Sequence, residues 1–127
     1  MESNIMRVFL LSFFEVFNAS VEKYKIEGKK VLGNIRWKDD NESQEFSWVV
    51  ELEGDILKKL KLLCEYLVKN NLMNGDKIVI TESELQERLN GLGWEKSDVQ
   101  KAIDGLLSIE MKMVDDGEYT DSFYIHF

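Results

Sequence analysis

The chain contains no proline, one cysteine and one histidine among its 127 residues. A single cysteine cannot form an internal disulfide, which excludes a small stapled secreted fold and fits a reducing compartment. Zinc needs more ligands than Cys64 and His126 can supply. The sequence therefore predicts no metal centre. We expect Cys64 to lie in the core and His126 to be structural or at the surface.

Motifs that carry common enzyme chemistry are also absent. The sequence holds no GxSxG, no P-loop, no GxGxxG and no HExxH. The acidic run Asp115, Asp116, Glu118 and Asp121 lacks the spacing and the closing glutamate of an EF-hand, so it predicts a solvated turn. We therefore expect a protein that is not an enzyme and that needs no cofactor.

No hydrophobic run is long enough to cross a membrane. The most apolar segment, residues 8–17, is interrupted by Ser12 and Glu15 and is shorter than the about 20 residues of a membrane span. Glu2 beside Arg7 leaves no net positive start, which disfavours a signal peptide. These features predict a cytoplasmic chain without membrane association.

Basic residues are in the minority. Sixteen Lys and Arg against 24 Asp and Glu give a formal charge of −8 and a pI near 4.7. This balance excludes a strongly basic nucleic-acid binder. A hydrophobic content of 44% predicts a folded chain rather than a disordered one.

The first residues have the pattern of a buried helix. Ten of the 13 residues from Ile5 to Phe17 are apolar, which predicts a helix over residues 4–24 that is buried on nearly every side. One small hairpin cannot easily cover so much apolar surface. Either the helix packs into the rest of the chain, or it meets its copy in a homodimer.

A β-hairpin is expected over residues 29–53, where apolar and polar residues alternate around a polar loop at residues 39–43. We expect Trp37 opposite Phe46 and Ile35 opposite Trp48, because this register gathers the large apolar groups on one face. Two lysines then face glutamates: Lys38 lies opposite Glu45, and Lys30 lies opposite Glu53.

From residue 55 the period becomes helical. Leucine spacing predicts a helix from Asp55 to about Asn70, and a turn and a short strand at residues 78–80 follow. Thr81 and Glu84 are spaced as a reciprocal capping box for the next helix. That helix has an inner stripe at Leu85, Leu89 and Leu92. A further helix starts at Glu95 or Ser97, and two alternating segments around an acidic turn close the chain.

This order of helix, short strand, helix, turn, helix and hairpin resembles the winged helix-turn-helix superfamily over residues 55–127. The segments that carry the resemblance are Ile80-Thr81-Glu82-Ser83-Glu84-Leu85, the turn Gly93-Trp94-Glu95-Lys96-Ser97-Asp98-Val99, and residues 106–114. The resemblance implies a recognition helix, a β wing and, as the usual function, DNA binding. We therefore expect an α+β fold in two parts: a helix and hairpin at residues 1–54, and a winged-helix-like module at residues 55–127.

The charge of the second part departs from that family. The expected recognition helix, residues 95–108, has a net charge of −1, and residues 109–127 have −4. An acidic wing is repelled by DNA. We therefore expect a protein–protein interaction module such as an adaptor, an inhibitor or a regulatory subunit, with a basic protein as partner. Its candidate binding residues are Trp94, Asp115, Asp116 and Glu118, although Trp94 fits a place in the core equally well.

The alternative is a dimeric DNA-binding regulator. Its contacts to DNA would come from Lys96, Gln100 and Lys101 on the recognition helix, and from a locally basic strand. That strand carries Lys29, Lys30, Arg36 and Lys38. The sequence favours another role for these four cations, which is pairing with glutamates of the next strand. It therefore favours the protein-binding hypothesis over DNA binding.

Overall fold

The computed structural model describes residues 7–15, 30–39, 42–115 and 118–127. Helices and strands are mixed in it, which confirms the α+β class. A helix at residues 7–15 comes first. The later elements are β1 (Lys30–Asp39), β2 (Glu42–Glu51), α2 (Gly54–Lys69), β3 (Met73–Asn74), β4 (Lys77–Ile78), α3 (Glu82–Gly91), α4 (Lys96–Leu107), β5 (Glu110–Asp115) and β6 (Glu118–Tyr124).

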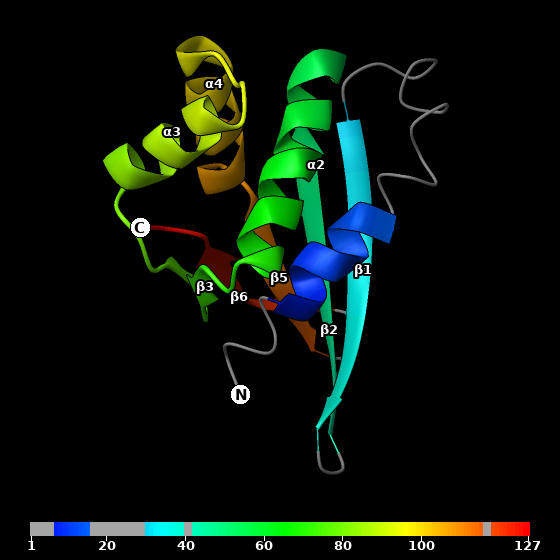
Figure 1. Cartoon of the computed structure of the whole chain (residues 1–127). Helices are drawn as coiled ribbons and strands as arrows, with labels where there is room; N and C mark the ends of the chain where they lie inside the picture. The colour runs from blue at the N-terminus through cyan, green and yellow to red at the C-terminus, as the bar shows by residue number, and fades with distance from the viewer. Residues whose placement is uncertain (1–6, 16–29, 40–41, 116–117) are drawn as a thin grey trace.

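Four strands form one antiparallel sheet in the order β1-β2-β5-β6. In Figure 1 the helix at residues 7–15 and α2 lie in front of this sheet, and α3 and α4 lie on the side of α2 away from β1. Pairing of β2 with β5 joins residues 1–54 to residues 55–127. Buried side chains from both parts also belong to a single core cluster.

The helices bury the apolar stripes that their spacing predicts. α2 turns five residues inward: Leu57, Leu60, Leu63, Cys64 and Leu67. α4 buries Val99, Ala102, Ile103 and Leu106 in the same way. Phe9, Leu10 and Phe13 are fully buried in the helix at residues 7–15. None of the helices in the described ranges is long and apolar enough to cross a membrane.

The register of the β1–β2 hairpin differs by two residues from the predicted one. Ile35 pairs with Phe46, and Trp37 pairs with Gln44, so the predicted pairs are wrong. The lysine pairs change as well: Lys30 lies opposite Glu51, and Lys38 lies opposite Ser43. The strands also run through most of the predicted loop, because Asp39 already pairs with Glu42.

Gly33 explains this register. It lies opposite Trp48, and a β-carbon at position 33 would overlap the Trp48 indole ring. Only glycine leaves room for this indole over the neighbouring strand. A shift of two residues keeps every side chain on the same face, so alternation alone cannot distinguish the two registers.

Replacing Gly33 with alanine is expected to lower the free energy of unfolding by about 1–3 kcal/mol, because the new methyl group overpacks the core against Trp48. Gly105→Ala is the control. Its β-carbon would approach Leu52 Cδ1 at 2.6 Å, which is the end of a flexible side chain, and alanine favours the helix by about 1 kcal/mol. Urea denaturation of both variants measures the difference. Equal stabilities would contradict the Gly33–Trp48 packing.

Two further sequence predictions need correction. The strand expected at residues 78–80 ends at Ile78, where β4 pairs with β3. Leu92, expected on the inner stripe of α3, is 62% exposed. The reason is that α3 ends at Gly91, so Leu92 lies in the turn before Gly93, which has a positive φ of 93°.

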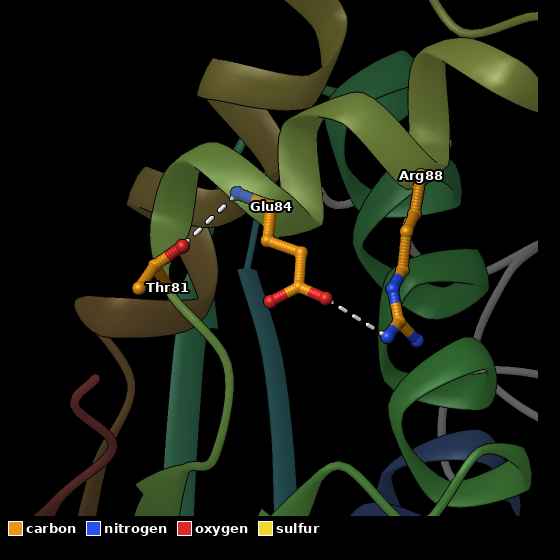
Figure 2. A network of polar contacts seen from close by, with 3 residues as sticks. All are labelled: Thr81, Glu84 and Arg88. Carbon is orange, nitrogen blue, oxygen red and sulfur yellow. Dashed lines mark hydrogen bonds and ion pairs between the residues drawn. The ribbon is translucent and has the colours of Figure 1, made fainter.

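The capping box of α3 forms only in one direction. Thr81 Oγ1 accepts a hydrogen bond from the Glu84 amide at 3.1 Å, as predicted. Figure 2 shows that the Glu84 carboxylate points away from Thr81 and binds Arg88 Nη2 at 3.1 Å. Arg88 follows Glu84 by four residues, so the two side chains are neighbours on the helix surface and form an ion pair there.

Candidate protein-binding surface

α4 (Lys96–Leu107) covers nearly all of residues 95–108, the segment in which the sequence predicts the recognition helix. Its inner side packs against α2, and Lys96, Lys101 and Asp104 are exposed. Glu95 precedes the helix as its N-cap, also exposed. The exposed side of α4 therefore mixes charges of both signs and does not form a row of cations.

The side chain of Gln100 is engaged within the fold. Its Oε1 accepts a hydrogen bond from Gln86 Nε2 at 2.7 Å. Its Nε2 donates to Glu82 Oε1 at 3.1 Å and to Asp104 Oδ1 at 2.9 Å. To read a base, the amide would have to give up these bonds, which join α3 to α4.

Trp94 is half-buried in the turn between α3 and α4, where it packs against the core. Lys59 Nζ lies 5.1 Å from the centroid of the indole ring, within the range of a cation–π contact. The same ammonium group lies 3.9 Å from Asp98 Oδ2. Trp94 thus fills part of the core and is also capped by a cation, so only part of its ring is open to a partner.

The acidic wing candidates lie around the β5–β6 hairpin. Glu118 is exposed at the start of β6. Asp115 ends β5, and its side chain lies outside the described part, as does all of Asp116. The other edge of β5 is paired with β2, so this hairpin is continuous with the sheet.

Negative charge is concentrated toward the C-terminus, from residue 81 onward. Residues 81–127, called here the acidic half, hold 11 acidic and four basic residues, which gives −7 of the formal −8. Two of the four cations are already neutralised: Arg88 pairs with Glu84, and Lys112 lies 4.0 Å from Glu110. This surface is therefore suited to a cationic partner.

Three of the basic-strand candidates of the DNA alternative, Lys30, Arg36 and Lys38, belong to β1, at the opposite edge of the sheet from β6. Arg36 is exposed, and its Nη2 lies 4.0 Å from Glu45 Oε2 on β2. Lys29 and the side chains of Lys30 and Lys38 lie outside the described part. Arg36, whose side chain is described, therefore forms an ion pair with a carboxylate of the neighbouring strand.

The helix at residues 7–15 packs within its own chain. Phe9 and Phe13 both contact the Trp48 ring, at centroid distances of 5.7 and 5.0 Å. On its outer side Leu11 remains 46% exposed. Dimerisation through this helix stays a prediction. Because Phe9, Leu10 and Phe13 are buried within the chain, less apolar surface of the helix is left for a second copy to cover.

Among the described residues, neither Cys64 nor His126 belongs to a cluster of metal-ligating side chains. Cys64 is buried in α2, and burial raises the pKa of its thiol. His126 is exposed near the C-terminus, with its Nε2 3.4 Å from Asp76 Oδ1. In the part of the chain that the structure describes, no group of three His, Cys, Asp or Glu side chains could hold a metal ion.

Cys64 is expected to resist alkylation in the folded protein. Burial excludes the reagent and keeps the thiol protonated, whereas the unfolded chain ionises near the ordinary thiol pKa of about 8.5. Iodoacetamide labelling at pH 8, with and without denaturant, measures this difference by mass spectrometry. Rapid labelling of the native protein would contradict the position of Cys64 in the core.

Exposed apolar residues on the sheet were not identified as a surface from the sequence. Leu32 is 61% exposed, Tyr124 52% and Val49 36%, all on the side of the sheet away from the core. Val49 and Leu32 occupy positions that alternation assigns to the polar face. An apolar residue at a position of the polar face is the sequence feature that could have indicated this surface.

Comparison of the chain with protein-family models, curated proteins and solved structures finds no match. The function therefore has to be argued from the surfaces described above.

Proposed function

We propose that this chain is a non-enzymatic protein–protein interaction module, built on a winged-helix-like scaffold, that binds a basic protein surface through its acidic half. The observation that carries the proposal is the separation of charge. Residues 81–127 hold −7 of the formal −8, and they include the helix and hairpin that bind DNA in the family the sequence resembles. Steering by this field speeds association with a cationic partner and weakens in salt.

The order of elements supports the scaffold. α2, the short strands β3 and β4, the helices α3 and α4, and the β5–β6 hairpin follow one another as the resemblance implies. Five acidic residues on α3, at the N-cap and on the surface of α4, and on β6 are solvent-exposed: Glu84, Glu87, Glu95, Asp104 and Glu118. Two others, Glu82 and Asp98, are half-buried and bind Gln100 and Lys59. A partner would therefore contact these exposed carboxylates, because the apolar stripes of α3 and α4 are buried.

Two features weigh against the DNA-binding alternative. The amide of Gln100 is held by three hydrogen bonds within the α3–α4 pair. Lys96 and Lys101 are outnumbered by three acidic residues on α4 or at its N-cap: Glu95, Asp98 and Asp104. The net charge of this helix therefore does not attract phosphates.

A charge-reversal experiment tests the proposal. The wild-type chain and the variant Asp115→Lys, Asp116→Lys, Glu118→Lys are immobilised, and the proteins that each retains from a lysate are quantified. We expect basic proteins to be retained by the wild type, to be released as salt rises, and to be retained at least about tenfold less by the variant.

The matched control reverses three acidic residues outside the acidic half: Glu15→Lys, Glu51→Lys and Glu65→Lys. It changes the net charge by the same amount, so it separates a local surface from the effect of total charge. Identical retention by the two variants would contradict a binding surface in the acidic half.

A further inference from the structure

The chain contains the dipeptide Asn-Gly twice, and the structure places the two copies in different surroundings. Asn74-Gly75 leads from β3 into the turn before β4, whereas Asn90-Gly91 ends α3. Both asparagines are exposed. Because the dipeptide is the same at the two places, a difference in its chemistry has to come from the fold.

Asparagine followed by glycine loses its side-chain ammonia without an enzyme. The glycine backbone nitrogen, once solvent base has removed its proton, attacks the asparagine side-chain carbon Cγ. A bond forms between this nitrogen and Cγ, the Cγ–Nδ2 bond breaks, and ammonia leaves a cyclic succinimide behind. Water then opens the ring at either carbonyl to give aspartate or isoaspartate. Glycine favours the closure because it has no side chain to hinder the approach and the widest choice of backbone angles.

The amide of Gly75 is not used by the fold. Asn74 pairs with Lys77, so Gly75 and Asp76 form a two-residue turn. Gly75 has a φ of 65° and takes the first position of this turn, where type II′ turns place glycine. The amide of that residue lies outside the strand pairing. Among the described residues, none forms a backbone hydrogen bond with the Gly75 amide.

The β3–β4 hairpin has to open for the reaction, because Gly75 is buried. Each of its strands has two residues, and so short a hairpin is marginally stable by itself. It is held by two backbone bonds: Ile78 N donates to the His126 carbonyl at 2.7 Å, and His126 N donates to the Asp76 carbonyl at 2.9 Å. Opening so small a unit needs much less free energy than unfolding the chain.

The amide of Gly91, in contrast, is bonded. Gly91 is the last residue of α3, so its amide donates to the carbonyl four residues earlier. The Leu89 carbonyl accepts hydrogen bonds from the amides of Leu92 and Trp94 at 3.0 and 3.1 Å, which close this end of the helix. Leu89 itself is fully buried. Freeing the Gly91 nitrogen therefore disrupts a helix end that is anchored in the core.

We infer that Asn74 is a site of spontaneous deamidation in the folded protein, and that α3 protects Asn90 from the same reaction. The reaction consumes water and releases ammonia, with no change of oxidation state. The new carboxylate lies opposite Lys77 and makes the formal charge one unit more negative than −8. Isoaspartate also adds a carbon atom to the main chain of the hairpin that binds His126, beside the C-terminal end in Figure 1.

Incubation of the full chain at mildly alkaline pH, native and in denaturant, tests this inference. Tryptic peptides 70–77 and 89–96 separate the two sites, and sequencing by mass spectrometry measures the conversion at each. In the native protein we expect conversion at position 74 to be at least about tenfold faster than at position 90. In denaturant neither element forms, so the two rates should agree within about twofold.

Several results would overturn the inference. One is a native rate at position 90 that equals or exceeds the rate at position 74. Another is a native chain that keeps Asn74 intact. A tenfold difference that persists in denaturant would overturn it too, because the difference would then come from the neighbouring residues and not from the fold. No result bears on the proposed function, since position 74 lies outside the acidic half.

Asn74→Gln and Asn90→Gln give a second readout. The extra methylene group disfavours ring closure, and both positions are exposed, so neither substitution disturbs the core. We expect ion-exchange chromatography of the incubated native protein to show a new acidic species in the wild type and in Asn90→Gln, and not in Asn74→Gln. An acidic species that persists unchanged in Asn74→Gln, or that disappears in Asn90→Gln, would contradict the assignment.

Discussion

Replacing Trp48 with alanine is expected to lower the free energy of unfolding by about 3–5 kcal/mol. The Trp48 side chain is 2% exposed and contacts both Phe9 and Phe13 from the helix at residues 7–15. It also fills the space above Gly33. Chains of this size have a total stability of about 5–15 kcal/mol, so the loss is a large fraction of it.

Trp48→Phe is the informative control. Trp48 Nε1 is buried and has no hydrogen-bond partner among the described residues, so phenylalanine removes no hydrogen bond and keeps most of the ring. We expect it to cost clearly less than alanine. Urea denaturation followed by circular dichroism measures both variants without relying on tryptophan fluorescence. A loss below about 1 kcal/mol for Trp48→Ala would contradict its central place in the core.

Phe13→Ala is expected to cost about 3–5 kcal/mol as well, because the side chain is fully buried against the sheet. Its ring centroid lies 5.0 Å from that of Trp48. Leu11→Ala, two residues away and 46% exposed, should stay within about 0.5 kcal/mol of wild type. Thermal and urea unfolding of the two variants measure whether this helix belongs to the core of its own chain.

Protein concentration gives the experiment a second readout. If Phe13 packs within one chain, the loss caused by Phe13→Ala is the same at every concentration. If the helix instead met its copy in a dimer, the stability of the wild type would rise with concentration and that of the variant would not. Small and equal losses for Phe13→Ala and Leu11→Ala would contradict the packing of this helix on the sheet.

Local periodicity was sufficient to predict much of the fold. Leucine spacing placed α2 within a residue of its observed ends, and Thr81 marked the start of α3. Alternation identified the faces of the β1–β2 hairpin. It could not choose between registers two residues apart, because both bury the same residues. That choice depends on the contact between Gly33 and Trp48, which is a property of packing and not of pattern.

The pairing of β2 with β5, which lie far apart in the chain, could not be predicted from the sequence either. Nothing in the composition of β2 or β5 indicates that Trp48 lies opposite Met111, and this pairing produces the continuous sheet. The charge of the candidate surface follows directly from residue counts. The engagement of Gln100 with Glu82, Gln86 and Asp104 does not, because it requires α3 and α4 to be placed in space.

The most direct test of the proposed function is binding to a labelled random-sequence DNA duplex, titrated from low to physiological salt. An interaction module with an acidic half should show no binding even at low salt, because the duplex repels it. The contradicting result is measurable affinity that falls linearly with salt on logarithmic axes. Its slope would count the phosphates contacted, and the chain would then have to be treated as a DNA-binding regulator.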